Sequence, residues 1–560
     1  MNTIFKHKIL TGAMLFGALF FASSCDDSEG LKVTPEVPFA DKTMFEVITS
    51  DAELTEFVDV LNACGAHCAD SLFNHSRVYT VWAPANGTFN KDSLIAEIEA
   101  GNRDQVFRCF IEAHIANHLK AANGKLEEDN KILLLNDKVA LFTGDYVNGY
   151  TFDGQKIDDA NIRVWNGILH KIAGPAEYKY NIWEFLKTDA RVDSVANFLY
   201  AFDVTEFSES QSIIGPIKDG EQTYLDSVFV TTNKFLRPWK GVGILNDEDS
   251  VYTVYVPTNE VWKEMLAISE KHFNYNTKIT NPTSLTPEMR DSMRHTHSRL
   301  NLIKYMTYSN YEQRYVESPD SIMPAWQGDD WDRPEFLKAD VEKNVIFEKE
   351  LSNGVFKIID KCPYTIFDLW HDTIKLEAEN EKMRTYIASG VDYIHSASKS
   401  QINKDSAFIG AEISGNRYFE LYSDKAATTV RYKVPNLLSA SYNVALIVVP
   451  KHITNADAAA DLKPHEMQIK ITQATGTTTA TIANHKDVHN DPTRLDTIFL
   501  TESSGERSVV TIPYCEYYNT GNEPDYGVVI EVKSDGNTKK YDRSIRLDAI
   551  LFIPVEDPVE

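Results

Sequence analysis

The stretch VYTVWAPANGTF at residues 78–89 is repeated, with changes, as VYTVYVPTNEVW at residues 251–262. Each copy begins with β-branched and aromatic residues, which favour a strand, and a proline then ends the run. An asparagine follows each proline by two residues, at Asn86 and Asn259, and asparagine is a typical helix cap. Each copy therefore predicts a strand, a sharp stop and a helix.

Two further landmarks accompany each copy of this stretch. They are TMFEV (43–47) and NIWEF (181–185) before it, and NGILHKI (166–172) and NGVFKIID (353–360) after it. Asn-Gly followed by alternating apolar residues is a strong hairpin signal. Because the landmarks recur in the same order, they indicate an internal duplication. A chain of 560 residues also exceeds what one hydrophobic core usually serves, so several domains are expected.

The landmarks resemble those of the fasciclin domain, whose pattern has an early TVFAPTN-type block and a closing NGVIHVID-type strand. The resemblance implies two fasciclin-like domains, at residues 41–175 and 176–362, each a β-sandwich with several helices packed on it. The first block departs from the pattern at Ala85, where threonine is usual. Some fasciclin domains contact receptors through a Tyr-His pair, but neither IEAHI (111–115) nor IKYM (303–306) keeps both residues. A receptor role of that kind is therefore not expected.

The histidine and cysteine residues do not form a recognisable metal site in the sequence. His114 and His118 are four residues apart and could bind a metal from one helix face, but no third ligand is identifiable. Hydrogen-bonded structural histidines are the preferred interpretation. Cys64 and Cys68, with Cys109 further along, are interpreted as buried thiols or one local disulfide. We expect no metal and no cofactor.

The first residues resemble the signal peptide of a bacterial lipoprotein. A basic start and an apolar run lead through small residues to Cys25. The resemblance implies that residues 1–24 are removed, that Cys25 is acylated, and that residues 25–40 tether the protein to outer-membrane lipid. The acidic residues that follow resemble the signal that exports lipoproteins to the cell surface in Bacteroidota, and a plain solvated tether is the alternative. They are Asp26, Asp27 and Glu29.

The last third of the chain has a different sequence pattern from the two repeats. The run TIFDLW (365–370) resembles a third fasciclin start, but no proline-asparagine block follows it. We interpret residues 363–404 as a helical connector, because their apolar residues are loosely spaced for one helix face. From residue 405 on, many short β-rich runs predict a β-sandwich or jelly roll over 405–560. The closing run RLDAILFIP (546–554) resembles the last strand of galactose-binding-like jelly rolls, which often serve as carbohydrate-binding modules.

One loop in the second fasciclin-like domain is a candidate for contact with a ligand or a partner. It reads PAWQGDDWDRP at residues 324–334. Its candidate residues are Trp326, Asp329, Asp330 and Trp331, because flat indoles beside carboxylates suit both sugar stacking and interface anchoring. The alternative is that both indoles tuck under the loop as a small satellite cluster.

The overall charge and the absence of catalytic motifs limit the function. The chain carries 56 Lys and Arg against 82 Asp and Glu, a net charge of −26 that argues against nucleic-acid binding. The sequence has no nucleophile elbow, no phosphate loop with lysine and no His-Glu-x-x-His motif, so we do not expect an enzyme.

The expected function is that of a surface-exposed lipoprotein without catalytic activity. Fasciclin-bearing lipoproteins of this kind are expected beside SusC/SusD-type transporters. The resemblance thus implies an accessory ligand-binding subunit of an outer-membrane uptake complex for glycan or peptide. The alternative is adhesion to host matrix or neighbouring cells, and a structural spacer without a ligand is a third possibility. A transporter partner requires a large protein-facing patch, whereas adhesion or glycan capture requires a distal exposed site.

Overall fold

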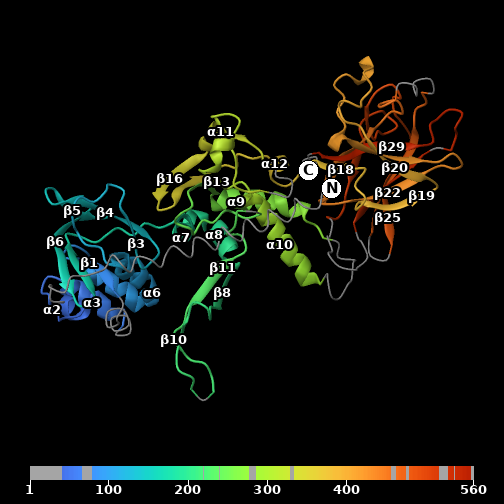
Figure 1. Cartoon of the computed structure of the whole chain (residues 1–560). Helices are drawn as coiled ribbons and strands as arrows, with labels where there is room; N and C mark the ends of the chain where they lie inside the picture. Colours follow the sequence, from blue (N-terminus) through green and yellow to red (C-terminus); the bar gives the residue numbers. More distant parts are fainter. Residues whose placement is uncertain are drawn as a thin grey trace. The chain divides into compact units, whose positions relative to one another are not determined.

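The computed structural model shows a β-rich chain with helices that divides into two compact units, one ending at Lys179 and the other beginning at Tyr180 (Figure 1). The residues described are 41–65, 78–218, 220–238, 240–275, 286–327, 333–455, 462–474, 478–515, 527–534 and 536–555. Among these residues, no helix combines the length and the apolar character needed to cross a membrane.

The first unit is built on one sheet with the strand order β2-β1-β7-β6-β5-β4-β3. The strands are β1 (Tyr79–Pro84), β2 (Ile115–Ala116), β3 (Lys131–Leu133), β4 (Val139–Asp145), β5 (Gly149–Phe152), β6 (Gln155–Val164) and β7 (Gly167–Ile172). The helices are α2 (Met44–Ser50), α3 (Thr55–Ala63), α5 (Lys91–Glu97) and α6 (Arg103–Val106). Successive residues of β1 face opposite sides of the sheet. Val81 packs with the helices, while Trp82 stacks on Phe152 with ring centroids 4.3 Å apart.

The second unit begins with a smaller sheet in the order β13-β12-β17-β16. The strands are β12 (Tyr252–Pro257), β13 (Thr307–Ser309), β16 (Val345–Leu351) and β17 (Gly354–Ile359), with the short pair β14 (Ser321–Ile322) and β15 (Phe336–Leu337) nearby. The helices are α7 (Ile182–Leu186), α8 (Asp193–Tyr200), α9 (Asn259–Ser269), α10 (Pro287–Ile303), α11 (Lys338–Glu342) and α12 (Ile366–Leu369). The order β2-β1-β7-β6 of the first unit is thus repeated as β13-β12-β17-β16.

The two copies agree in detail, which confirms the predicted duplication. Strand β1 runs parallel to β7 with Tyr79 opposite Gly167, and β12 runs parallel to β17 with Tyr252 opposite Gly354. A Cβ added to either glycine would lie within 2.0 Å of the opposite carbonyl oxygen, so glycine is required at both positions. The asparagine before each glycine holds the first helix of its copy. Its Oδ1 accepts the first backbone N–H of α2 or of α7, in each case at 2.8 Å.

The asparagines of the repeated stretch each accept a backbone N–H at the start of a helix, and that helix precedes the stretch. Asn86 Oδ1 accepts the backbone N–H of Glu56 in α3, and Asn259 Oδ1 accepts that of Ser194 in α8. The helices that follow the stretch are capped by Asn90 and by Thr258. The chain folds back and brings each asparagine to the start of the helix that precedes it.

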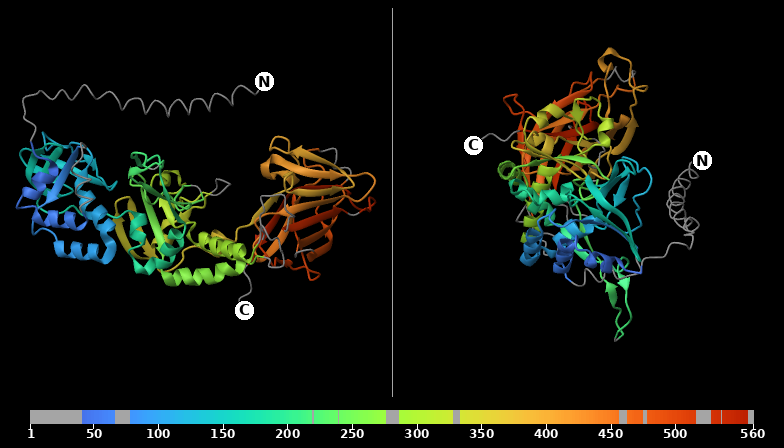
Figure 2. Two further views of the ribbon diagram at one scale, coloured as in Figure 1. Left: turned by 90° about the horizontal axis from the view of Figure 1, so that it is seen from below. Right: turned by 90° about the vertical axis from the view of Figure 1, so that its left-hand side faces the viewer.

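The rest of the second unit is a sandwich of two antiparallel sheets (Figure 2). One sheet has the strand order β20-β21-β29-β23-β26; in addition, β18 pairs with β29, and β27 pairs with β23. The other sheet has the order β19-β22-β28-β24-β25. The strands are β18 (Ile374–Glu377), β19 (Arg384–Ala388), β20 (Val391–Ser396), β21 (Arg417–Tyr422), β22 (Thr429–Val434), β23 (Ser441–Val448), β24 (Glu466–Ala474), β25 (Thr479–His489), β26 (Asp496–Phe499), β27 (Val509–Thr511), β28 (Val528–Ser534) and β29 (Ile545–Pro554). Apolar side chains from both sheets fill the space between them.

The sandwich begins earlier than residue 405, and the predicted helical connector 363–404 is largely wrong. Only α12 is an α-helix there, whereas β18, β19 and β20 already belong to the two sheets. Ile374 and Leu376 are two residues apart and pair with Phe552 and Ile550 on the last strand. That spacing places both side chains on one face of a strand, and burial against β29 decides in favour of extended backbone.

Candidate functional site

The second unit carries a two-stranded arm that was not predicted. It consists of β8 (Asp203–Phe207) paired with β11 (Phe229–Asn233), continued by β9 (Ile213–Ile214) paired with β10 (Tyr224–Asp226). We call residues 203–233 the arm. In Figure 1 and in the right-hand view of Figure 2 it extends away from the helices and the sheet that precede and follow it in its own unit.

The base of the arm is fixed to the body of the unit by hydrogen bonds. Asn233 donates its side-chain N–H groups to the carbonyl oxygen of Leu199 in α8 and to Asp203 Oδ1, both at 2.8 Å. Further out, Thr205 and Thr231 face each other across the ribbon with their hydroxyl oxygens 2.8 Å apart. The contact with Leu199 ties the base of the arm to α8, and the other two contacts hold the strands of the arm together.

The arm exposes large apolar side chains to solvent. Val204 is 51% exposed, Ile214 61%, Ile217 71% and Phe229 63%. Phe207, which is 40% exposed, touches the ring of Tyr224 at a centroid distance of 4.8 Å and that of Phe229 at 5.7 Å. Scattered single apolar residues are normal on protein surfaces, but the rings of Phe207, Tyr224 and Phe229 touch one another, and such an apolar group on one projecting element is typical of a docking surface.

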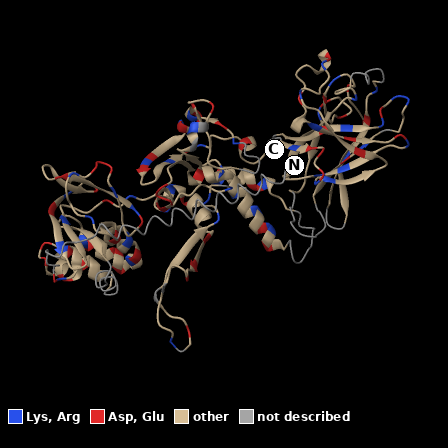
Figure 3. Ribbon diagram, viewed as in Figure 1, with Lys and Arg blue, Asp and Glu red and all other residues tan. Residues whose placement is uncertain are grey.

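The arm is also acidic. Between residues 203 and 233 the sequence has six Asp and Glu residues and one lysine, Lys218. Positions of acidic residues are coloured red along the ribbon of the arm in Figure 3. On β8 the acidic residues are Asp203 and Glu206, whereas β11 has none. An apolar group with an acidic surround favours a partner surface that is apolar and flanked by basic residues.

The predicted contact loop is only partly described. Trp326 is half-buried and packs against the core of the second unit, which agrees with the alternative in which this indole tucks under the loop. The backbone N–H of Lys240 donates to the carbonyl oxygen of Gln327 at 3.2 Å. Asp329, Asp330 and Trp331 lie outside the described residues, and so do Cys25, Asp26, Asp27 and Glu29. The proposed roles of these seven residues therefore stay predictions.

His114 and His118 do not share a helix face, so that possibility for a metal site is wrong. A short 3₁₀ helix ends at His114 and the strand β2 follows, which separates the two side chains. His114 is buried; its Nδ1 lies 2.5 Å from the carbonyl oxygen of Phe110, and its Nε2 accepts the backbone N–H of Ala176 at 2.9 Å. Burial lowers the pKa of His114 to about 4, so the ring is neutral at pH 7. Within the described residues, no three His, Cys, Asp or Glu side chains form a group able to hold a metal ion.

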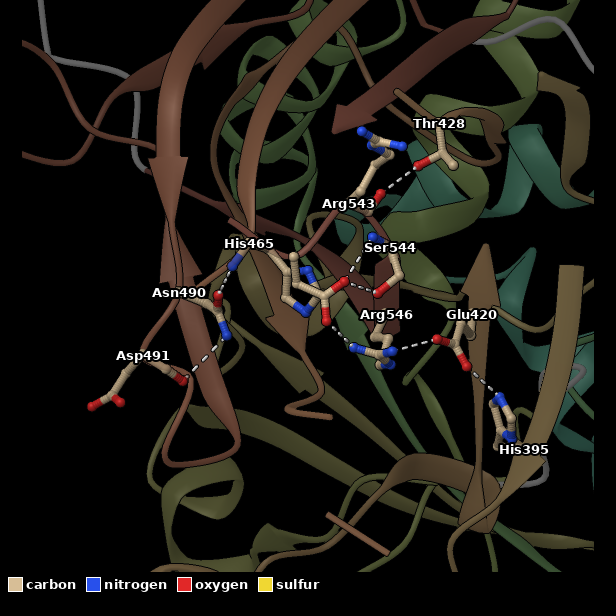
Figure 4. Close-up of polar contacts among 10 residues, drawn as sticks. His395, Glu420, Thr428, His465, Asn490, Asp491, Arg543, Ser544 and Arg546 are labelled. Carbon is tan, nitrogen blue, oxygen red and sulfur yellow. Dashed lines mark hydrogen bonds and ion pairs between the residues drawn. The ribbon is translucent and has the colours of Figure 1, made fainter. Parts of the chain in front are cut away.

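The sandwich contains a network of polar and charged side chains centred on the buried Arg546 (Figure 4). The guanidinium donates to Glu420 at 2.5 Å and to Asp542 at 2.9 Å, and His395 lies 2.6 Å from the other oxygen of Glu420. Burial favours the protonated form of Asp542, but Arg546, His465 and hydrogen bonds from Ser544 lower the pKa of Asp542 overall. Arg546 is paired with Glu420 and with Asp542 inside the protein, which indicates a structural role for these three residues.

A polar groove of about 470 Å³ opens beside this sandwich core. Its lining includes Lys375, Lys399, Glu412, Ser414 and Asp548. The ion pair between Lys399 and Glu412, with 2.5 Å between the charged atoms, spans two of its loops. Burial raises the pKa of Asp548 to about 7, and the nearby Glu377 contributes to the rise. Positively and negatively charged hydrogen-bonding groups line this groove, and a groove of this size could hold a neutral polar ligand such as a sugar.

Sequence reasoning overlooked the arm although a signal was present. The runs DVTEF (203–207) and FVTTN (229–233) are both β-rich, and GPIKDG (215–220) between them is rich in turn residues. Two such runs around a turn predict a hairpin. Its exposure could not be inferred in the same way, because no pattern of residues shows that an apolar strand lacks a neighbour.

Comparison with known proteins gives structural neighbours of low similarity. No protein-family model matches the chain, and no curated protein matches it. One structural neighbour is a FAS1 domain pair from the insect cell adhesion molecule fasciclin I, with 12% identity and a TM-score of 0.18 over 58% of this chain and 97% of that chain. Another is the CBM32 domain of AlyQ in complex with 4,5-unsaturated mannuronic acid, with 5% identity and a TM-score of 0.14 over 30% and 97%.

A third neighbour contains the CBM51-2 domain of Clostridium perfringens ZmpB in complex with GlcNAc, with 13% identity and a TM-score of 0.16 over 42% of this chain and 37% of that chain. The neighbours thus include fasciclin and carbohydrate-binding domains, the two kinds of domain that the sequence resembles. TM-scores this low carry no argument about the chain, so the family assignments stay predictions.

Proposed function

We propose that this chain is a surface-exposed lipoprotein without catalytic activity, anchored through Cys25. In this proposal it serves as an accessory ligand-binding subunit of a SusC/SusD-type outer-membrane complex that takes up glycan or peptide. The signal-like N-terminus supports the anchor, and the resemblance of the two repeats and of the sandwich supports a binding role rather than an enzymatic one.

The arm is the observation that carries this proposal. A permanent transporter partner requires a protein-facing apolar surface, whereas adhesion requires only a distal ligand site. The arm supplies such a surface, with Phe207 and Phe229 in ring contact and more than a third of each side chain exposed. Asn233 attaches the base of the arm to α8 through one hydrogen bond.

The polar groove of the sandwich is the candidate place for ligand capture. It contains both cations and carboxylates but no aromatic platform among its lining residues. A polar lining of this kind favours hydrogen bonds to hydroxyl groups over stacking. In the proposal the sandwich holds the glycan or glycopeptide while the arm holds the transporter.

Affinity purification of the lipidated protein tests this proposal. The protein, tagged at its C-terminus, is recovered from detergent-solubilised membranes of its own cells, and accompanying proteins are identified by mass spectrometry. We expect a large β-barrel and its lipoprotein lid in stoichiometric amounts. The double variant Phe207→Ser with Phe229→Ser should lose them. The matched control is Val147→Ser, because Val147 is 90% exposed but lies in the first unit.

Two results would contradict the proposal. Recovery of the wild-type chain without other proteins would contradict the association with a transporter, and normal uptake in a deletion strain would contradict the accessory role. If the deletion strain instead lost adherence to matrix or to neighbouring cells, the adhesion alternative would replace the proposal. Binding of the soluble protein to a glycan array, abolished by Lys399→Ala, would assign the ligand to the sandwich groove.

A further inference from the structure

The arm has a free backbone edge as well as an apolar surface. In the described part of the chain, β8 pairs with β11 and with no other strand. Ser208 donates its backbone N–H to the carbonyl oxygen of Val228 at 2.8 Å, which marks these two residues as a hydrogen-bonded pair. Because such pairs alternate along an antiparallel ladder, the N–H groups of Thr205 and Phe207 point away from β11. The outer edge of β8 therefore offers backbone donors and acceptors to an incoming strand.

A two-stranded ribbon of this kind gains stability from a third strand. Isolated hairpins are at best marginally stable in water, and three strands with an apolar face are the usual minimum. Every residue of β8 from Val204 to Phe207 is exposed. Val204 and Glu206 lie on one face of the ribbon, while Thr205 and Phe207 lie on the other, so β8 has an apolar side chain on each face.

The charges of the arm favour its β8 edge over its β11 edge as the place where a partner strand pairs. Asp203 and Glu206 lie on β8, and β11 carries no charged residue. A strand beside β8 would place a residue opposite Glu206 and another opposite Phe207. Lysine or arginine suits the first position and an apolar residue suits the second. The edge of β11 offers no comparable charge complementarity.

We infer that the arm binds its partner by strand addition. An extended segment of a partner protein, with alternating apolar side chains and a Lys or Arg opposite Glu206, pairs with the outer edge of β8 and completes a three-stranded sheet. The identity of that partner as a transporter subunit rests on the proposed function. The mode of binding does not, because it follows from the edge, the exposed side chains and the charge of β8.

Hydrogen exchange on the unmodified protein tests this inference directly. Deuterium uptake is compared between the purified chain and the chain held in isolated membranes of its own cells. We expect the backbone amides of Thr205 and Phe207 to exchange at least ~10-fold more slowly in the membranes. The amides of Tyr146 to Asn148, in an exposed turn of the first unit, should exchange at the same rate in both. Unchanged exchange at Thr205 and Phe207 would overturn the inference.

A pair of proline variants separates main-chain pairing from side-chain contact. Thr205 and Thr231 face each other, their hydroxyls share one hydrogen bond, and both N–H groups point outward. Thr205→Pro removes the outward N–H of β8 and should lower recovery of the partner at least ~10-fold, whereas Thr231→Pro should not. Thr205→Val keeps the N–H and should bind normally. Normal binding by Thr205→Pro, or loss confined to Thr231→Pro, would overturn the inference.

The experiments separate failure of this inference from failure of the proposed function. If a transporter is recovered equally with the wild-type chain and with Thr205→Pro, the proposed function stands and strand addition is wrong. If no transporter is recovered but the amides of β8 are protected in membranes, the proposed function fails and strand addition to another protein stands. If both proline variants lose the partner, hydrogen exchange on the wild-type chain decides between the two outcomes: slower exchange at Thr205 and Phe207 in membranes supports strand addition, and unchanged exchange overturns it.

Discussion

Replacing Arg546 by methionine should destabilise the sandwich and leave the rest of the chain unaffected. The Arg546 side chain is 7% exposed, and its two carboxylate partners, Glu420 and Asp542, are 12% and 14% exposed. Arg546→Met removes the positive charge from both. Removing one partner of a buried ion pair costs about 3 to 5 kcal/mol, because the remaining charge is left buried without compensation. Part of this cost appears as a rise in the pKa of Asp542.

The expected change in melting temperature follows from the size of the domain. For a domain of this size 1 kcal/mol shifts the melting temperature by about 2 to 4 °C, so Arg546→Met should lower it by about 6 to 20 °C. Scanning calorimetry records every transition of the chain. All eight tryptophans lie at or before Trp370, outside the sandwich, so tryptophan fluorescence reports the other domains. The calorimetric sandwich transition should move and the fluorescence transition should not.

A second variant tests the physical reason for this loss. Adding Asp542→Asn and Glu420→Gln to Arg546→Met removes the uncompensated buried charges, which are the main cost of breaking a buried ion pair. The triple variant should therefore recover most of the lost melting temperature. A shift below 2 °C for Arg546→Met, or an equal shift in the fluorescence transition, would refute the reasoning.

Three further outcomes follow from the geometry. Gly354→Ala should destabilise the second unit by more than ~3 kcal/mol in chemical unfolding, because its Cβ would lie 1.9 Å from a carbonyl oxygen, whereas Gly536→Ala, with nothing within 4 Å, should be tolerated. The pKa of Asp548 is raised to about 7, so the folded state holds a proton that the unfolded state loses near pH 4, and stability from this group falls as the pH rises between those values. Asp548→Asn removes this pH dependence. The free energy of unfolding of the variant minus that of the wild-type chain should therefore rise by up to about 4 kcal/mol between pH 4 and pH 8. Urea titrations in which this difference does not change with pH would contradict the prediction. Full burial of the exposed part of Phe229, which is 63% exposed, is worth about 3 kcal/mol, so Phe229→Ser should weaken partner binding by up to ~100-fold in titrations of the purified complex, and Phe207→Ser by less; equal affinities would contradict it.

The parts of the fold that the sequence predicts well depend on local constraints. Gly167 and Gly354 each pass close to a neighbouring backbone, and Asn166 and Asn353 each accept the first backbone N–H of a helix at 2.8 Å. The same residue types therefore recur where the same geometry recurs. Strands β22 and β24 of the sandwich alternate buried residues with more exposed ones, and this local pattern predicts a strand. These features require no knowledge of the distant chain.

The parts that the sequence did not predict depend on contacts between distant segments. Asn86 caps α3 rather than the helix that follows it, because the fold brings the start of α3 to the asparagine. Ile374 is extended because β29, far away in the sequence, supplies the apolar surface on which it packs. The hairpin of the arm has a local signal in its two β-rich runs, but the exposure of its apolar side chains could not be inferred from that signal.

The most direct test of the account is a photo-crosslink from the arm in living cells. A photoreactive phenylalanine analogue is placed at Phe229, and in a control chain at Val147, which is 90% exposed in the first unit. After irradiation the adducts are identified by mass spectrometry. The account predicts adducts from position 229 to an outer-membrane β-barrel or its lipoprotein lid, and none of these from position 147. No adduct from position 229, or the same adducts from both positions, would contradict it.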